Sequence, residues 1–189
     1  MKTITTERLI LRPFNEKDIP ALYLFMKDKA TNTYLPWFPL NSVQEAKTYY
    51  QRISTDENNV RFAICLQEDN IPIGYVKISC QEAHDFGYAL RSEFWNRGIA
   101  TEACTSAIKY AQSLDLPFIT ATYDRNNSAS GHVIRKLGMK YAYSYETLWQ
   151  PKNKVVTFRL YQLNFTTPSE YIYQGYWDKA TVRYIEEGL

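Results

Sequence analysis

Hydrophobic and polar residues alternate over several short runs of the chain, which is the pattern of strands with one buried face. The clearest run surrounds Leu9 and Leu11 near the start of the chain. Two pairs of later runs are separated by polar turns and predict hairpins. The pattern predicts strands at 6–14, 60–66, 72–80, 84–90, 118–123, 139–149 and 155–165.

Other segments repeat their apolar residues every three or four positions, as amphipathic helices do. One helix is predicted after an N-cap at Asn15, and a second after a capping box of Ser42 and Glu45. A third begins at Ile99, and a fourth covers the stretch NNSASGHVIRKLG and ends at Gly138. The order β-α-α-β-β-β-α-β-α-β-β predicts an α/β protein of the mixed α+β kind, a mixed sheet with helices on its faces.

The stretch FWNRGIATEA, residues 94–103, joins a predicted strand to the third helix. The first N–H groups of a helix have no partner within it, and the helix dipole adds partial positive charge there. Gly98 and Ala100 keep side chains away from this backbone, and Arg97 adds a full charge. The combination suits a diphosphate. The alternative is an ordinary loop-to-helix joint with a solvated arginine.

Three separated motifs resemble the GNAT acetyltransferase superfamily, and within it the RimJ/RimL-type N-acetyltransferases. FWNRGIATEA is similar to the YWGKGYATEA of that branch, although Trp95 stands where most superfamily members have Gln or Arg. TERLILRP (6–13) follows the branch pattern TERLxLRP. NSASGHVIRKLGM (127–139) follows NxxSxxVxxKLGF, with Met139 in place of Phe. The resemblance covers roughly residues 5–165, which implies a GNAT N-acetyltransferase domain at 1–165.

The resemblance implies a mostly antiparallel sheet that splays between its fourth and fifth strands, 84–90 and 118–123. Acetyl-CoA, as co-substrate, lies in this gap, where unpaired backbone groups bind its pantetheine arm. The N–H of Tyr88 polarises the thioester carbonyl and then stabilises the oxyanion. The implied cofactor-binding residues are Tyr88, Leu90, Asn96, Arg97, Gly98, Ile99, Ala100, Thr101, Asn127 and Ser130. From the sequence alone, Asn127 could equally be a helix cap.

Acetyl transfer to an amine needs a group that stabilises the departing thiolate and a group that accepts a proton. The tyrosine that serves the thiolate in many superfamily members is replaced here by Ile134, so Ser130, one turn earlier, is the candidate; capping the helix is its alternative role. His84 is the candidate base, because it shares a strand face with Tyr88 and an imidazole titrates near neutral pH. Asp85 is then expected to point away. A water relay is the alternative base.

Residues 32–40, NTYLPWFPL, are predicted to be irregular because two prolines interrupt them. In the RimJ/RimL-type branch this segment closes the acceptor side of the cleft. Tyr34, Trp37 and Phe38 are therefore candidates for the acceptor pocket, although packing under the loop would also explain them. The expected acceptor is a primary amine, such as a peptide or protein N-terminus. A small-molecule amine is the alternative acceptor, and a CoA-binding module without catalysis is the alternative function.

Charge and composition exclude several other classes of function. The net charge is +2 with no basic block, which argues against a nucleic-acid partner. No apolar run approaches the roughly 20 residues of a membrane span, and no signal-peptide core is present. With two histidines and scattered cysteines at Cys65, Cys80 and Cys104, no metal site is expected. Reduced thiols and the missing signal peptide indicate a cytoplasmic protein.

The last 24 residues, 166–189, are rich in aromatics and poor in aliphatics. An exposed aromatic stripe is unusual for a monomer, so this C-terminal extension is expected to pack on its own domain or on a second copy in a homodimer. A final helix is predicted from about Asp178. The aromatics in question are Tyr171, Tyr173, Tyr176, Trp177 and Tyr184.

Overall fold

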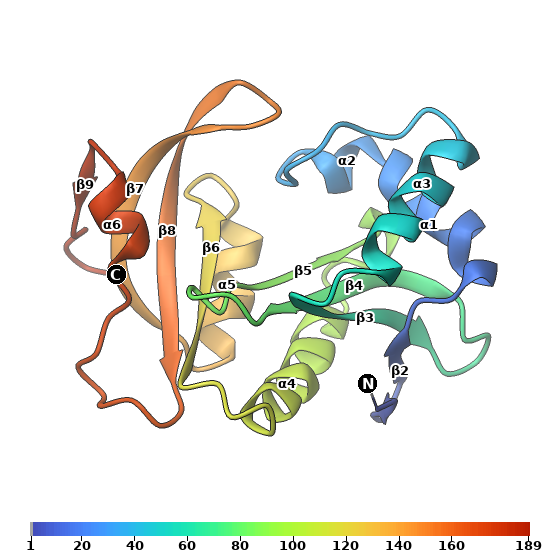
Figure 1. Ribbon diagram of the computed structural model, residues 1–189, viewed down its shortest axis with the longest axis horizontal. Helices are drawn as coiled ribbons and strands as arrows, with labels where there is room; N and C mark the ends of the chain where they lie inside the picture. The colour runs from blue at the N-terminus through green and yellow to red at the C-terminus, as the bar shows by residue number, and fades with distance from the viewer. Residues whose placement is uncertain (1) are drawn as a thin grey trace.

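The computed structural model describes residues 2–189 (Figure 1). The strands are β1 (Ile4–Thr5), β2 (Leu9–Pro13), β3 (Asn59–Leu66), β4 (Pro72–Ser79), β5 (Phe86–Leu90), β6 (Phe118–Asp124), β7 (Lys140–Trp149), β8 (Lys154–Asn164) and β9 (Arg183–Tyr184). The helices are α1 (Ile19–Lys27), α2 (Lys29–Asn32), α3 (Val43–Ser54), α4 (Ile99–Gln112), α5 (Ser128–Lys136) and α6 (Gly175–Lys179). Short 3-10 turns occupy Glu16–Asp18 and Ser92–Phe94.

The strands form two antiparallel sheets that meet at a single point. One sheet has the order β1-β2-β3-β4-β5 and the other the order β6-β8-β7-β9. β5 and β6 are joined by one parallel bridge, Asp85 with Thr120, and Thr120 N donates to His84 O at 3.2 Å. Beyond this bridge the two strands diverge, and Figure 1 shows the sheets running in different directions on either side of the gap. The predicted splay between the strands at 84–90 and 118–123 is confirmed.

Helices cover both faces of the five-stranded sheet, and strand alternation decides which side chain meets which helix. On β4, Val76 and Ile78 are fully buried in the core that includes α4. Tyr75 points to the opposite face, where it packs with Phe25 of α1. The α4 face is built largely of alanines, which let the helix approach the sheet closely. The predicted class, a mixed α/β fold with helices on both faces, is confirmed.

Two predicted helix starts are present with small differences. Asn15 and Asp18 form a reciprocal capping box, although the first turn is a 3-10 turn that precedes α1. Ser42 Oγ accepts a hydrogen bond from Glu45 N at 3.2 Å and caps α3. The Glu45 carboxylate accepts from Asn41 N at 3.1 Å, so the reciprocal bond is shifted by one residue from the predicted box. α3 still begins where the sequence predicts.

The C-terminal extension lies against β7 and β8 (Figure 1). The rings of Tyr176 and Tyr145 stack at 5.3 Å with an interplanar angle of 3°. Tyr143 Oη donates to Tyr173 O at 2.8 Å, and the Arg159 and Glu186 side chains form an ion pair. These contacts lie within one chain. A homodimer through this extension stays a prediction.

The prediction of a final helix from Asp178 is wrong. α6 begins earlier and ends at Lys179, because Ala180 is already extended, with φ −87° and ψ 136°. The chain then pairs with the free edge of β7, where Tyr184 lies opposite Ser144. The open backbone groups of an edge strand favour a paired strand over a further helical turn.

We expect deletion of residues 167–189 to lower the free energy of unfolding by about 3–5 kcal/mol, because it uncovers two buried tyrosines of β7 and removes β9. For a chain of this size that loss corresponds to a fall in Tm of roughly 10 °C. Thermal melts of the full and truncated chains measure it, and light scattering reports any change in mass. Equal Tm values would show that the extension contributes nothing to stability.

Candidate active site

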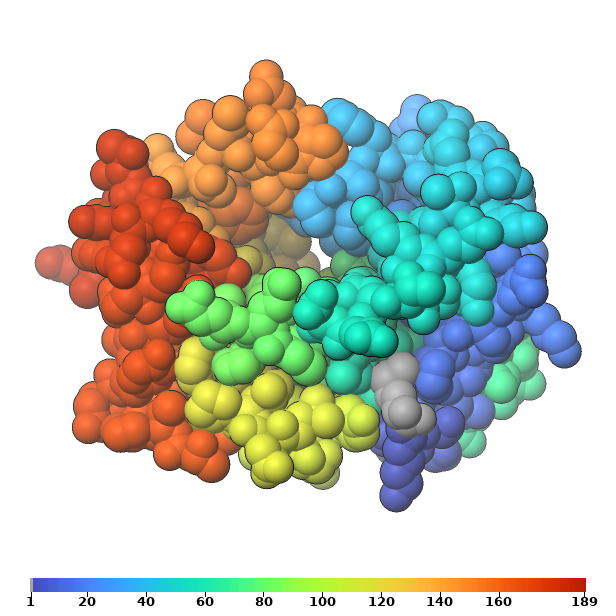
Figure 2. Space-filling view, in the orientation of Figure 1, coloured from blue at the N-terminus to red at the C-terminus, as the bar shows by residue number. Residues whose placement is uncertain are grey.

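A cleft of about 1000 Å³ opens where β5 and β6 diverge. Its walls come from β4, β5 and β6, from the N-terminal ends of α4 and α5, and from the segment around α2 and α3. Figure 2 shows the hollow between the blue and cyan N-terminal helices, the green β5 region and the orange β7–β8 hairpin. The volume is at the upper end of the range for small-ligand sites.

The first turn of α4 opens into this cleft without a cap. Gly98 is the N-cap residue and adopts a left-handed φ of 74°, and no side chain accepts a bond from the first turn. Asn96 is also left-handed, with φ 59°, so the loop approaches the helix through two unusual backbone turns. The open backbone N–H groups belong to Ile99, Ala100 and Thr101, all of which line the cleft. This arrangement fits an anion such as a diphosphate.

Two side chains of the loop fix it to its surroundings. Trp95 Nε1 donates to the carbonyl of Leu90 at 2.9 Å and ties the loop to the end of β5. The Arg97 guanidinium lies 5.6 Å from the centre of the Phe94 ring, and Arg97 lines the cleft. The residue that departs from the common Gln/Arg pattern of the superfamily therefore has a structural role.

Two of the motifs that carry the family resemblance contact each other here. Glu102, in the first turn of α4, accepts hydrogen bonds from Thr6 Oγ1 at 2.6 Å, Arg8 N at 3.0 Å and Arg8 Nε at 2.7 Å. Arg8 Nη1 also donates to Arg97 O at 2.9 Å. Burial alone would raise the pKa of Glu102, but the bonds from Thr6 and Arg8 together lower it. Sequence reasoning missed this contact, although TERL and ATEA were both singled out.

The free edge of β5 supplies a second set of backbone groups. Arg91 N donates to Ile73 O at 2.9 Å, and hydrogen-bonded positions alternate along an antiparallel ladder, so the odd-numbered residues of β5 bond β4. The N–H of Tyr88, an even position, therefore points into the gap, where the five-stranded sheet has ended. The Leu90 carbonyl points the same way but accepts from Thr31 Oγ1 at 3.1 Å. Of the predicted pair, both N–H groups face the gap, and the Leu90 carbonyl is already used by Thr31.

Ser130 and Tyr88 are brought together across the cleft. The Tyr88 hydroxyl lies 2.9 Å from Ser130 Oγ and donates to Ser130 O at 3.0 Å. Burial raises the pKa of Tyr88, so its hydroxyl stays protonated. Asn127 Oδ1 accepts from Ser130 N at 3.2 Å, so Asn127 caps α5 while also lining the cleft. Ile134, at the position of the missing tyrosine, is buried.

The predicted orientations of His84 and Asp85 are reversed. His84 lies outside β5 with a left-handed φ of 45°, and its ring packs 5.0 Å from the ring of Phe118. It does not line the cleft, whereas Asp85 does, with Oδ2 3.0 Å from Lys77 Nζ. Asp85 stays in register with β4, because Ser79 N donates to Asp85 O at 2.9 Å, and its side chain shares the face of Lys77. This face, and not the face of the Tyr88 side chain, lines the acceptor wall, and the left-handed backbone of His84 takes its ring out of the strand pattern.

The acceptor-side candidates separate into two groups. Tyr34 and Trp37 line the cleft, and the Tyr34 hydroxyl donates to Asn126 O at 3.2 Å. Phe38 is 59% exposed and does not line it, so the prediction for Phe38 is wrong.

Other residues of this wall were not predicted, because they come from distant segments. They are Tyr49 and Arg52 of α3, Arg61 of β3, and Tyr75 and Lys77 of β4. Arg61 and Lys77 are cross-strand partners. No single stretch of sequence carries this cluster, and only the pairing of β3 with β4 under α3 assembles it.

The turn of the β7–β8 hairpin reaches over the cleft to α2 (Figure 1). Lys152 Nζ donates to the carbonyls of Asn32 and Thr33, the second at 3.0 Å. Trp149, at the end of β7, lines the cleft below this contact. The hairpin therefore covers one side of the acceptor wall.

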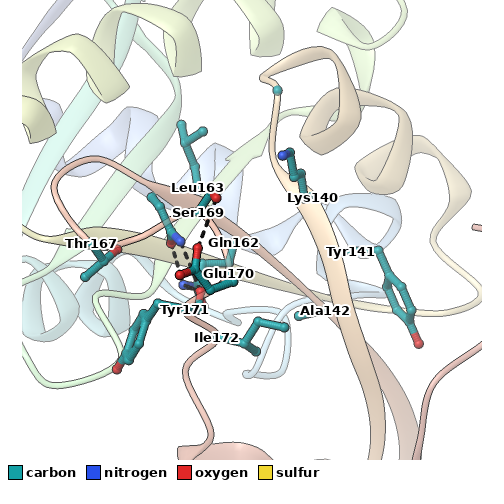
Figure 3. A pocket seen from close by; sticks show the side chains of 12 residues that line it. Lys140, Tyr141, Ala142, Gln162, Leu163, Thr167, Ser169, Glu170, Tyr171 and Ile172 are labelled. Carbon is teal, nitrogen blue, oxygen red and sulfur yellow. Dashed lines mark hydrogen bonds between the residues drawn. The ribbon is translucent and has the colours of Figure 1, made fainter.

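A second cavity, of about 370 Å³, lies between the C-terminal extension and β7 and β8 (Figure 3). Its polar groups bond within the chain: Gln162 Nε2 donates to Tyr171 O at 2.8 Å, and Asn164 Nδ2 donates to Pro168 O at 2.7 Å. These hydrogen bonds hold the extension against β8.

Among residues 2–189, no three His, Cys, Asp or Glu side chains are grouped to hold a metal ion. Within the same range, none of the helices is long and apolar enough to cross a membrane. The three cysteines are free.

Comparison with known proteins agrees with this geometry. YnaD of Bacillus subtilis (strain 168), named an uncharacterized N-acetyltransferase, is 28% identical over 141 residues, covering 72% of this chain and 82% of its own length. RimL, a ribosomal L7/L12 alpha-N-protein acetyltransferase solved with coenzyme A, superposes with a TM-score of 0.76 at 21% identity, covering 87% of this chain and 99% of RimL. Spermidine N-acetyltransferase from Vibrio cholerae, solved with CoA and spermine, gives 0.73 at 16%, covering 84% and 96%. The two solved structures show the shared fold.

A family model described as an acetyltransferase (GNAT) domain matches residues 8–140, which is most of the chain. The match includes the uncapped α4 turn, the free edge of β5 and Ser130. The chain therefore belongs to the GNAT acetyltransferase family and is an acetyl-CoA-dependent N-acyltransferase.

Proposed function

We propose that the protein transfers the acetyl group of acetyl-CoA to the primary amine of a peptide or protein N-terminus, by direct attack in a ternary complex. The observation that carries the proposal is that the uncapped turn of α4 and the free Tyr88 N–H open into the same cleft. The first fits the pyrophosphate and the second fits a thioester carbonyl.

The cofactor is held mainly by backbone groups in this proposal. The N–H groups from Arg97 to Thr101 bind the pyrophosphate, with Arg97 adding charge, and Asn127 and the β5 edge bind the pantetheine arm. The support is that these backbone groups have no competing side-chain cap and all line one cleft. Gly98 allows the left-handed turn that aims them.

The chemical step proceeds by attack of the neutral amine on the thioester carbon. The oxyanion of the tetrahedral intermediate accepts a hydrogen bond from Tyr88 N–H. The C–S bond then breaks, and the departing thiolate accepts a hydrogen bond from Ser130 Oγ, which the Tyr88 hydroxyl orients at 2.9 Å.

We assign the amine's proton to Asp85 rather than His84. Two carboxylates line the cleft, but Asp124 Oδ1 already accepts from Asn126 N at 2.9 Å and Asp124 is only 4% exposed. Asp85 keeps one oxygen outside its pair with Lys77. Strand spacing puts Asp85 roughly 10 Å from Tyr88, so the proton reaches it through water.

The acceptor class is supported by the shape of the cleft. The β7–β8 hairpin covers the acceptor wall through Lys152, and a covered cleft admits a slender group such as a chain terminus. RimL, which shares the fold, acts on a protein alpha-amine by its name. A small-molecule amine is the second candidate, because the spermidine enzyme shares the same fold. A cytoplasmic location is part of the proposal, since acetyl-CoA and reduced thiols occur there together.

A panel of peptides and small amines with acetyl-CoA tests the proposal. Thiol release gives the rate, and mass spectrometry locates the acetyl group on the product. We expect acetylation at the alpha-amine of peptides. Thiol release only with small amines would favour a small-molecule acceptor. CoA binding without any acetyl transfer would favour a CoA-binding module without catalysis.

Ser130→Ala should lower kcat by roughly tenfold or more, as for a lost transition-state hydrogen bond, with CoA affinity little changed. Ser113→Ala, which removes a serine hydroxyl at the end of α4 outside the cleft, is the matched control and should leave kcat unchanged. Steady-state kinetics and thermal melts separate the two roles of Ser130. A Ser130 variant that loses only stability, with kcat intact, would assign it to the helix alone.

Glu102→Gln should weaken CoA binding several-fold, because it loosens the bonds that hold Arg8 against the cofactor loop. The pKa of Glu102 lies below its ordinary value of 4.5. Its stabilising effect is therefore complete above that value and is lost as the pH falls through the lower, folded-state pKa. Calorimetric titration of CoA across this acid range should show a fall in affinity that the variant lacks. If CoA affinity changes with pH in the same way in the two proteins, the contact of Glu102 with Arg8 does not support CoA binding.

A further inference from the structure

The acceptor wall carries a row of cationic side chains. Arg61 of β3 lies opposite Lys77 of β4, and Lys77 lies opposite Gly87 of β5. A side chain at Gly87 would meet only Lys77 Cε, at 3.9 Å, so the space above this row is open. Gly87 directly precedes Tyr88, which brings the row next to the N–H assigned to the thioester carbonyl. Arg52 of α3 lines the same wall.

These charges are incompletely neutralised. Asp85 pairs with Lys77 at 3.0 Å, and Arg61 reaches Asp56 only at 3.5 Å. Among residues 2–189, no carboxylate lies within 4.0 Å of the Arg52 guanidinium. Lys77 and Arg61 are therefore each paired with a carboxylate, whereas Arg52 is not, and the wall carries an excess of positive charge at Arg52.

Aromatic rings hold both guanidinium groups in position. The Arg52 guanidinium lies 5.0 Å from the centre of the Tyr49 ring, and that of Arg61 lies 5.8 Å from the centre of the Tyr75 ring. Trp37 packs between these tyrosines, at 6.0 and 6.2 Å from their ring centres. These ring contacts favour the positions in which the two guanidinium groups face the cleft, although Arg52 itself is exposed.

The same cluster contains buried donors without acceptors. Arg61 Nε and Trp37 Nε1 are both buried and have no hydrogen-bond partner within residues 2–189. A buried donor left unpaired costs free energy, so a cluster with two of them is incomplete within the chain. A carboxylate in the cleft supplies negative charge and several acceptor oxygens, in a geometry that matches the outward-facing N–H groups of an arginine fork.

We propose that the acceptor is an anionic amine, namely an acidic peptide N-terminus or an amino acid; this inference rests on the proposed function. The carboxylate of the acceptor binds at Arg52 and Arg61 while its amine faces Tyr88. Polyamines and lysine-rich peptides meet like charge at the same wall and are poor substrates. The positive wall also disfavours the protonated form of the acceptor amine, which helps attack.

The test compares Ser-Glu-Glu, Ser-Gln-Gln and Ser-Lys-Lys tripeptide amides and spermine at saturating acetyl-CoA. We expect kcat/KM to fall in that order, with at least about a tenfold gap between the first and third peptides. Arg52→Gln should shrink that gap several-fold, mainly by raising KM for the acidic peptide. Lys109→Gln removes an exposed charge on α4 that lies outside the cleft. It is the control and should leave the ratio of kcat/KM between the acidic and basic peptides unchanged.

Arg61→Lys is the variant for the more buried of the two arginines. It keeps the positive charge so that the protein folds, and thermal melts check the folding. Calorimetry of the same peptides with the CoA complex separates this inference from the proposed function. If nothing is acetylated but the acidic peptide binds at least tenfold more tightly, the anion site stands and the transfer proposal fails. Equal rates and affinities for the acidic and basic peptides, or spermine as the better substrate, overturn the anion site.

Discussion

Replacing Gly98 with valine is expected to lower the affinity for CoA by two orders of magnitude or more. Gly98 has a φ of 74°, which valine avoids, so the turn that aims the first N–H groups of α4 is lost. A branched side chain at this position also stands where the pyrophosphate approaches the backbone. Isothermal titration calorimetry with CoA measures the change directly.

Gly138→Val is the matched control for this substitution. Gly138 has a similar φ of 78°, ends α5, and lies outside the cleft with open space around it. Both substitutions should cost about 1–2 kcal/mol of stability through backbone strain, but only the Gly98 variant should lose CoA. Unchanged CoA affinity in Gly98→Val would remove the α4 turn from the site.

A second large effect is expected at Asp85. Asp85→Asn should lower kcat by about 100-fold, since it removes the carboxylate that receives the amine's proton and keeps the shape of the side chain. His84→Gln should leave kcat within about twofold, because its ring packs on Phe118 outside the cleft. The sequence-based interpretation was the opposite: it made His84 the base and expected Asp85 to point away.

Initial rates across pH with one good peptide measure both variants. A preserved kcat in Asp85→Asn would point to water and backbone carbonyls alone as the proton route. A large loss in His84→Gln, with normal CoA affinity and Tm, would return the role to histidine.

The cofactor half of the site could be predicted because it is local in sequence. One decapeptide carries the loop, the glycine and the helix start, and these residues fold next to one another. The position of the Tyr88 N–H at the sheet edge, which the family resemblance implies, agrees with the regular pairing of β5 with β4. The family motifs also help to predict this half of the site, because the residues of each motif are contiguous in the sequence.

The acceptor half could not be predicted because folding assembles it from distant segments. Arg52, Arg61 and Lys77 are unremarkable charges in the sequence, and only the register of β3 with β4 under α3 joins them. The contact of Arg8 with Glu102 spans 94 residues. The predictions for His84 and for the end of the C-terminal extension failed because a left-handed residue just before β5 and the free edge of β7 overrode the local pattern.

The most direct measurement is thiol release from acetyl-CoA while the concentrations of acetyl-CoA and of a peptide amine are varied together. Direct attack in a ternary complex predicts that release requires the amine, that the reciprocal plots intersect, and that the enzyme alone forms no acetylated intermediate by intact mass. Parallel plots with an acetylated enzyme would contradict direct transfer, and absence of release with every amine, despite tight CoA binding, would contradict catalysis itself.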